Sequence, residues 1–237
     1  MKFAIIAAGE GSRLSQEGID LPKPLVRIDG EPMIDRLVRI FNENGAEEVC
    51  IIVNRLHPQT EAHVRQLARS GTGAPIRIVV KTTPSSMHSF FELSPYLGDR
   101  PFCLTTVDTI FREDEFGRFV EAFRQSQADG LMGVTDFVDD EKPLYVGTDA
   151  DLHITGFHDN DEGDRYISGG IYALRPIALT TLRRCMAEGK SRMRNFQRAL
   201  IEDGRRLQAW PFSKVLDVDH ASDIRKAEQF LNETKAV

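Results

Sequence analysis

Several patterns that would point to particular protein classes are missing from this sequence. The 237 residues include only three cysteines and no CxxC pair, and no apolar run approaches the length of about 18 residues that a membrane helix needs. These absences argue against a disulfide framework, a zinc site and a transmembrane segment. The apolar start reaches Gly9 too soon for a signal peptide, so we expect a cytoplasmic protein with reduced cysteines.

The charge balance also lacks the basic excess of a nucleic-acid-binding protein. Thirty Lys and Arg residues stand against 36 Asp and Glu, which gives a net charge of −6, and the two signs are interspersed. We therefore expect neither a nucleic acid nor a membrane as partner. The hydrophobic fraction of 41% is that of an ordinary globular chain, so we expect one domain that covers residues 1–237.

Apolar runs that suit strands alternate with amphipathic stretches that suit helices in the first 140 residues. The runs are nearly continuous, as in strands that are covered on both faces. This order predicts an α/β fold with a mixed, mostly parallel sheet flanked by helices. The strands are expected at 3–7, 48–53, 76–80, 101–107 and 131–138, and the helices at 31–44, 58–70 and 113–127.

The pattern changes after residue 140 to short strands with turns, followed by two helices near 176–187 and 192–203. This part predicts a small antiparallel insertion. The last part contains two short strands and a helix for which Ser222 is the expected cap. We therefore divide the single domain into parts 1–140, 141–212 and 213–237.

A glycine-containing loop follows the first strand, in the sequence AAGEGSRL. Gly9 and Gly11 allow tight turning and let backbone amides approach a phosphate, although a plain turn would account for two glycines as well. A dinucleotide fingerprint needs a third small residue where Arg13 and Leu14 stand, and no GK[ST] follows for a P-loop.

Lys23 lies between two prolines in LPKPL, and these restrict the backbone around it. By itself this segment is typical of a surface turn. Together with Arg13 and the glycine loop, it places two cations beside a phosphate cradle. The combination indicates a polyphosphate ligand.

The run AAGEGSRLSQEGIDLPKPLVRIDGEPMI (7–34) resembles the amino-terminal signature of nucleotidyltransferases that make nucleoside-diphosphate sugars. The resemblance implies a Rossmann-like enzyme that transfers a nucleoside monophosphate from NTP to a phosphorylated acceptor, a sugar 1-phosphate, and releases pyrophosphate. It also assigns roles to the loop. Arg13 would bind the outer phosphates and Lys23 the reacting one, with the triphosphate against Ala8, Gly9, Gly11 and Ser12.

The same resemblance implies a Mg²⁺ site made of two acids. Asp108 follows the fourth predicted strand, where the family's metal-binding Asp stands, although a turn aspartate would also fit this position. The second acid comes from LDVDHASDIRKAE, in which Asp217 and Asp219 are two residues apart. Different relatives align with different members of this pair, so both remain candidates.

Two further segments match the family more loosely. Ser85 and Ser86 lie where relatives carry a loop near the base, and Ser168, Gly169 and Gly170 lie where relatives carry a strand near the sugar. The resemblance therefore gives the acceptor to 141–212, the nucleotide to 1–140, and the closing strand and helix to 213–237. His158 and Asp159 are acceptor candidates too, but their sequence favours a solvated turn.

The expected reaction is an in-line attack by the acceptor phosphate on the α-phosphorus, in which Lys23 and Arg13 stabilise the leaving pyrophosphate. Three alternatives stay open: phosphocholine or another alcohol phosphate as acceptor, a molybdopterin-like phosphate as acceptor, and a regulatory module that binds NTP without turnover. The sequence decides neither the base nor the acceptor, and it is compatible with a homodimer.

Overall fold

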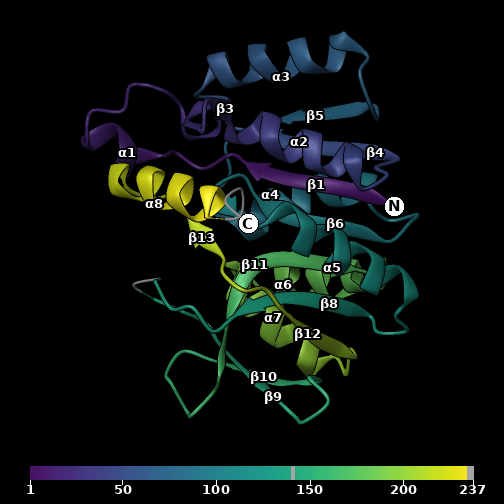
Figure 1. The fold of residues 1–237 in the computed structure, drawn as a ribbon. Helices are drawn as coiled ribbons and strands as arrows, with labels where there is room; N and C mark the ends of the chain where they lie inside the picture. Colours follow the sequence, from purple (N-terminus) through teal and green to yellow (C-terminus); the bar gives the residue numbers. More distant parts are fainter. Residues whose placement is uncertain (140–141, 234–237) are drawn as a thin grey trace.

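A computed structural model of the protein describes residues 1–139 and 142–233. Its centre is a nine-stranded sheet with the order β10-β9-β11-β6-β1-β4-β5, in which β8 pairs with β11 and with β12 (Figure 1). The strands are β1 (Lys2–Ala7), β4 (Glu48–Val53), β5 (Ile76–Val80), β6 (Phe102–Thr106), β8 (Gly130–Thr135), β9 (Tyr145–Thr148), β10 (Ile154–His158), β11 (Tyr166–Leu174) and β12 (Leu207–Pro211).

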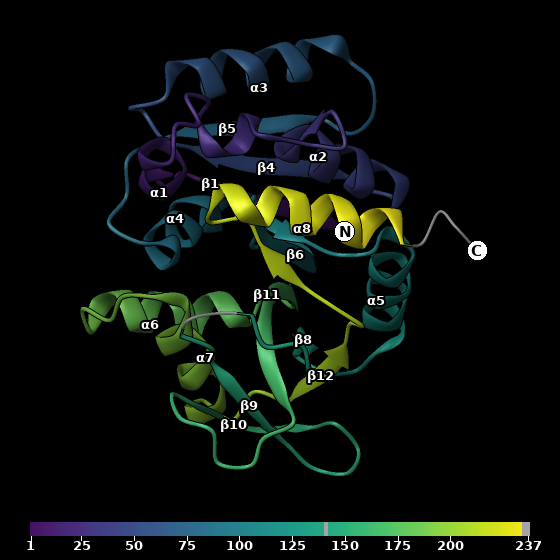
Figure 2. The same ribbon diagram turned by 60° about the vertical axis from the view of Figure 1, so that its left-hand side comes forward.

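Helices cover both faces of this sheet, and two short ribbons lie at its edge (Figures 1 and 2). The ribbons pair β2 (Arg27–Ile28) with β3 (Glu31–Pro32), and β7 (Thr109–Ile110) with β13 (Leu216–Asp217). The helices are α1 (Ser12–Gln16), α2 (Met33–Glu43), α3 (Pro58–Ser70), α4 (Ser86–Leu93), α5 (Glu113–Gln125), α6 (Ala178–Ala187), α7 (Met193–Glu202) and α8 (Ala221–Asn232), with 3-10 turns at Lys23–Leu25 and Ser94–Tyr96.

Strand β1 shows why the apolar runs of the sequence are continuous. Its side chains alternate between two separate cores: Phe3 and Ile5 pack with α2, α5 and α8, whereas Ala4 and Ile6 pack with α4, α6 and α7. Successive side chains of a strand point to opposite faces, so a strand covered on both sides needs apolar residues at every position. β1, β4, β5 and β6 pair in parallel, which confirms the predicted fold class.

The antiparallel strands expected after residue 140 are present, but they extend the main sheet. β11 pairs antiparallel with β6 on one side and with β8 on the other, and β9 and β10 continue outward from it. The predicted boundary at residues 140 and 141 and the end of the closing part, 234–237, lie outside the described residues. In the described chain no helix has the length and apolar character needed to cross a membrane.

The segment that lies where relatives carry a loop near the base forms the helix α4, which begins after Ser85. One local expectation, the cap of the last helix, was wrong. The last helix begins after His220 and is not capped by Ser222: the Asp223 amide donates to the His220 carbonyl at 3.0 Å, and the Asp223 carboxylate accepts the His220 amide at 2.9 Å. This reciprocal capping box satisfies two free amides, so Ser222 falls inside the first turn.

The strand order positions the site. β1 lies between β4, which follows it in the chain, and β6, which follows β5. The connections after β1 and β6 therefore leave in different directions, and the carboxyl ends of these two strands form the switch point where open α/β sheets bind ligands.

Candidate active site

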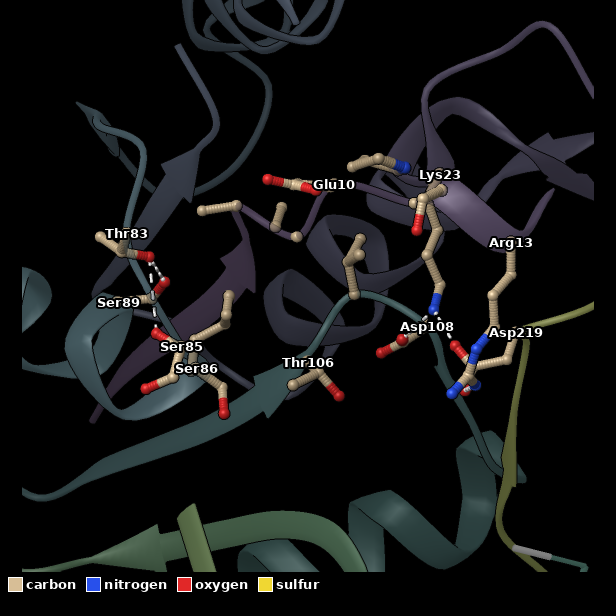
Figure 3. A pocket seen from close by; sticks show the side chains of 18 of the residues that line it. Glu10, Arg13, Lys23, Thr83, Ser85, Ser86, Ser89, Thr106, Asp108 and Asp219 are labelled. Atoms are coloured by element: carbon tan, nitrogen blue, oxygen red, sulfur yellow. Dashed lines mark hydrogen bonds and ion pairs between the residues drawn. The ribbon is translucent and has the colours of Figure 1, made fainter. Parts of the chain in front are cut away.

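A cavity of about 380 Å³ lies at the carboxyl ends of β1 and β6; we call it the first cavity (Figure 3). It brings together the glycine loop, the Pro-Lys-Pro segment, the start of α4 and the segments after β6 and β13. The sequence-predicted residues on its wall are Ala8, Gly9, Gly11, Ser12, Arg13, Lys23, Ser85, Ser86, Asp108 and Asp219.

Gly11 fixes the relation between the glycine loop and Lys23. Its φ of +64° is left-handed, and a Cβ added there would lie 3.0 Å from the Cβ of Lys23. A side chain at this position would therefore be strained and would push against the lysine. The two segments pack directly on each other because residue 11 has no side chain.

The Lys23 ammonium lies between two carboxylates. It donates a hydrogen bond to Oδ1 of Asp219 at 2.7 Å and forms an ion pair with Asp108 (Figure 3). Arg13 Nη1 binds the other carboxylate oxygen of Asp219 at 2.8 Å. Burial disfavours the charged ammonium, but the attraction and hydrogen bonds of Asp108 and Asp219 outweigh it, and the pKa of Lys23 is raised well above its ordinary value.

The backbone brings Asp219 to Asp108 across a large sequence separation. β13 pairs antiparallel with β7, and the Val218 amide donates to the Asp108 carbonyl at 3.1 Å. The chain then leaves the strand, so that Asp219 turns onto Lys23. Asp217 remains on the strand opposite Thr109 and lines a neighbouring cavity. Of the two late acids left open by the sequence, Asp219 is the one placed with Asp108.

The acids fit the chemistry of a Mg²⁺ site. Asp108 and Asp219 both reach one ammonium, so their oxygens converge on a common point that a cation already occupies. Over the ranges 1–139 and 142–233, no group of three or more His, Cys, Asp or Glu side chains could hold a metal. Mg²⁺ accepts a site in which two carboxylates bind it and phosphate and water complete the coordination. The Lys23 ammonium would have to move away from the two carboxylates first.

The end of the first cavity away from Lys23 is rich in hydroxyl groups (Figure 3). Ser85 caps α4, where its Oγ contacts His88 Nδ1 at 2.9 Å, and Thr83 Oγ1 lies 2.6 Å from Ser89 Oγ. Thr83, Ser89 and Thr106 were missed from the sequence. Thr83 and Thr106 could have been found from their positions after the third and at the end of the fourth parallel strand, in the runs KTTP and LTTV, whereas Ser89 lies on α4.

A second cavity of about 380 Å³ adjoins the first and shares Arg13 and Asp219 with it. Of the predicted acceptor residues, Ser168 and Gly169 line it. Gly170 does not: it lies within the irregularity of the β11 pairing between Ser168 and Ile171, with φ +70°, and a Cβ added there would lie 3.6 Å from Thr109 Oγ1.

The remaining acceptor candidates have structural partners. The Ser168 hydroxyl donates to Gln197 Oε1 at 3.0 Å. Asp159 binds Arg194 at 2.6 Å and Arg198 at 2.8 Å, and these two arginines lower the pKa of its carboxyl. His158 and Asp159 line neither cavity; His158 is the last residue of β10, so the expected turn begins only at Asp159, which is ion-paired.

The family of the chain follows from its similarity to known proteins. Residues 3–202 match the family described as the MobA-like NTP transferase domain. The chain belongs to this family of nucleotidyltransferases. Arg13, Lys23 and Asp108 lie within the matched residues, whereas Asp219 and α8 lie beyond them.

Individual curated relatives have low sequence identity to this chain, but the aligned segments are long. The probable glucose-1-phosphate cytidylyltransferase of Bacillus subtilis is 21% identical over 74% of this chain and 75% of its own length. Three other curated relatives are longer, and the chain spans between 50% and 58% of their length.

Two solved structures share the fold across almost the whole chain. A putative glucose-1-phosphate thymidylyltransferase from Bacillus anthracis has a TM-score of 0.85 at 18% identity, with 98% of this chain and 96% of that one covered. The inositol-1-phosphate CTP transferase from T. maritima has a TM-score of 0.81 at 19% identity, with 99% and 96% covered.

Proposed function

We propose that the chain transfers a nucleoside monophosphate from NTP to a sugar 1-phosphate and releases pyrophosphate. The observation that carries this proposal is that the first and the second cavity share part of their walls. Arg13 and Asp219 line both cavities, so a ligand in one lies next to a ligand in the other at the Lys23 cluster.

The first cavity suits an NTP because its two ends differ. Hydroxyl groups at the α4 end offer neutral hydrogen-bonding partners for a base and ribose, whereas Arg13, Lys23 and the glycine loop suit the phosphates. In this orientation the reacting phosphate would lie beside Lys23, away from the base.

The second cavity would hold the acceptor. A phosphate monoester dianion is itself a nucleophile at neutral pH, so the chain needs no activated Ser or His for this reaction. Its task is to bring two anions together and to stabilise the charge that moves to the leaving pyrophosphate. Lys23 and Arg13 are the cations placed for this role.

Asp108 and Asp219 are the residues that would hold Mg²⁺, with Asp217 nearby on the acceptor side. The bound metal would supply positive charge between the two phosphates. Lys23 would then release the two carboxylates and turn its ammonium to the nucleotide.

A non-sugar phosphate is the second candidate acceptor. It is favoured by the solved inositol-1-phosphate CTP transferase, whose fold covers 99% of this chain. The second cavity itself does not choose between the two, because Lys142, Lys226 and Asp217 could serve either phosphorylated ring.

A pyrophosphate-release assay tests the proposal. Each of the four NTPs would be combined with Mg²⁺ and with glucose 1-phosphate, mannose 1-phosphate, inositol 1-phosphate or phosphocholine. We expect release that needs both substrates, strongest with a sugar 1-phosphate. Release strongest with inositol 1-phosphate or phosphocholine would assign the second candidate, and no release with any pair would refute the transferase proposal.

A further inference from the structure

Glu17 joins the glycine-loop segment to the far end of the chain. It is the C-terminal capping residue of α1, and its carboxylate bridges 204 positions to accept the backbone amide of Ala221 at 2.6 Å. Its other oxygen lies 2.6 Å from His220 Nδ1. Both contacts are made to the turn that follows Asp219.

The turn is held from two directions. From inside the carboxyl-terminal segment, the Asp223 carboxylate accepts the amides of Asp219 at 3.2 Å and His220 at 2.9 Å. From the amino-terminal side, the Glu17 carboxylate accepts the amide of the following residue, Ala221. Asp219 therefore stands at the start of a turn whose backbone is tied to the segment that also carries Arg13.

The glycine loop has few apolar anchors that could replace this contact. Gly9, Ser12 and Arg13 are exposed, and Leu14 is the buried residue of α1. An exposed ion pair contributes little to the stability of a fold. The effect of Glu17 is therefore expected in the geometry of the turn more than in the free energy of unfolding.

We propose that Glu17 is a positioning residue for nucleotidyl transfer, which fixes Asp219 at the wall between the two cavities by holding the Ala221 amide. This inference rests on the proposed function. Glu17 lines neither cavity, so it acts through Asp219 and not on a substrate. Small misplacements of a positioned group are costly in rate: ~1 Å can cost about 100-fold.

Three variants test the role by steady-state kinetics. Glu17→Ala removes the acceptor of the Ala221 amide, and we expect kcat to fall roughly tenfold with the KM for NTP nearly constant. Glu17→Gln keeps an oxygen that can accept the Ala221 amide, and we expect it to recover most of the rate. Glu61→Ala is the matched control, because Glu61 forms an exposed pair with Arg65 on α3, away from both cavities. We expect it to behave as wild type.

Amide hydrogen exchange of residues 218–222 gives a readout that needs no turnover. Exchange should be faster in Glu17→Ala than in wild type and should be restored in Glu17→Gln, while thermal unfolding shows that all variants are folded. Unchanged exchange in Glu17→Ala, an unchanged kcat, or a kcat in Glu17→Gln as low as in Glu17→Ala would overturn the positioning role. An inactive wild type would instead refute the transferase proposal, and exchange alone would then decide whether Glu17 holds the turn.

Discussion

The two cavities differ in how the chain builds them. Most of the wall of the first cavity comes from short runs of neighbouring residues, which follow β1, β5 and β6 or belong to the Pro-Lys-Pro segment. The second collects residues from β8, β11, β13 and α8, which are far apart in the sequence. The comparison teaches that local motifs build most of the cavity proposed for the nucleotide, whereas long-range packing builds the cavity proposed for the acceptor.

Lys23→Ala tests the charged end of the first cavity and should have the largest effect. The variant loses the cation placed for the leaving pyrophosphate, so we expect kcat to fall by about 100-fold or more. Pyrophosphate release measures this, and circular dichroism checks that the variant stays folded. Lys81→Ala, which removes an exposed partner of Glu92, is the control. Near-normal release by Lys23→Ala would contradict the assigned role.

A pair of variants separates the two late acids. Asp219→Asn alters the wall shared by both cavities, and we expect kcat to fall about 100-fold. Asp217→Asn alters the second cavity, so we expect mainly a higher KM for the acceptor, by a few-fold. Steady-state kinetics with each substrate varied in turn distinguishes these outcomes. Equal effects on kcat would show that the two aspartates act together and would remove the distinction between the cavities.

Two glycine variants sharpen the description of the loop. Gly11→Ala introduces a strained left-handed residue against Lys23, and we expect the Tm to fall by about 2–8 °C. At Gly9 an added Cβ would meet nothing within 4 Å, so Gly9→Ala should keep the wild-type Tm and raise only the KM for NTP. A Tm that falls equally in both variants would argue against this local account of Gly11.

The smallest predicted effect concerns the pH dependence of stability in the acceptor half. Arg198 and Arg194 lower the pKa of the Asp159 carboxyl below its ordinary value of 3.8. The ionised carboxylate therefore adds to the free energy of unfolding above pH 3.8, and this addition is lost as the pH falls through the folded-state pKa. We expect Asp159→Asn to lower the Tm by about 1–3 °C at pH 7 and by less near pH 3. A difference that grows toward acid pH would contradict the sign of this linkage.

The sequence was most informative where structure is decided locally. The parallel strands were predicted because burial on both faces demands continuous apolar residues, and the runs 48–53 and 76–80 match β4 and β5. The Lys23 site was predicted because two prolines and a glycine loop restrict their own backbone.

The choice between Asp217 and Asp219 could not be predicted, for a physical reason. Residues two apart on a strand share a face, so spacing alone would place both acids together. β13 has only the residues Leu216 and Asp217, and the chain turns after it to form the capping box of α8. The turn sends Asp219 to Lys23, and it depends on contacts with Glu17 and Asp108 from distant segments.

The contact between Arg13 and Asp219 closes a separation of 206 positions. Asp108 and Asp219 are themselves 111 positions apart, so a ribosome that has synthesised the glycine loop, Lys23 and Asp108 has yet to add the segment that carries the second acid. Nascent chains can thus contain the glycine loop long before they can gather both acids around one cation. The Lys23 cluster can assemble only after Asp219 has been synthesised.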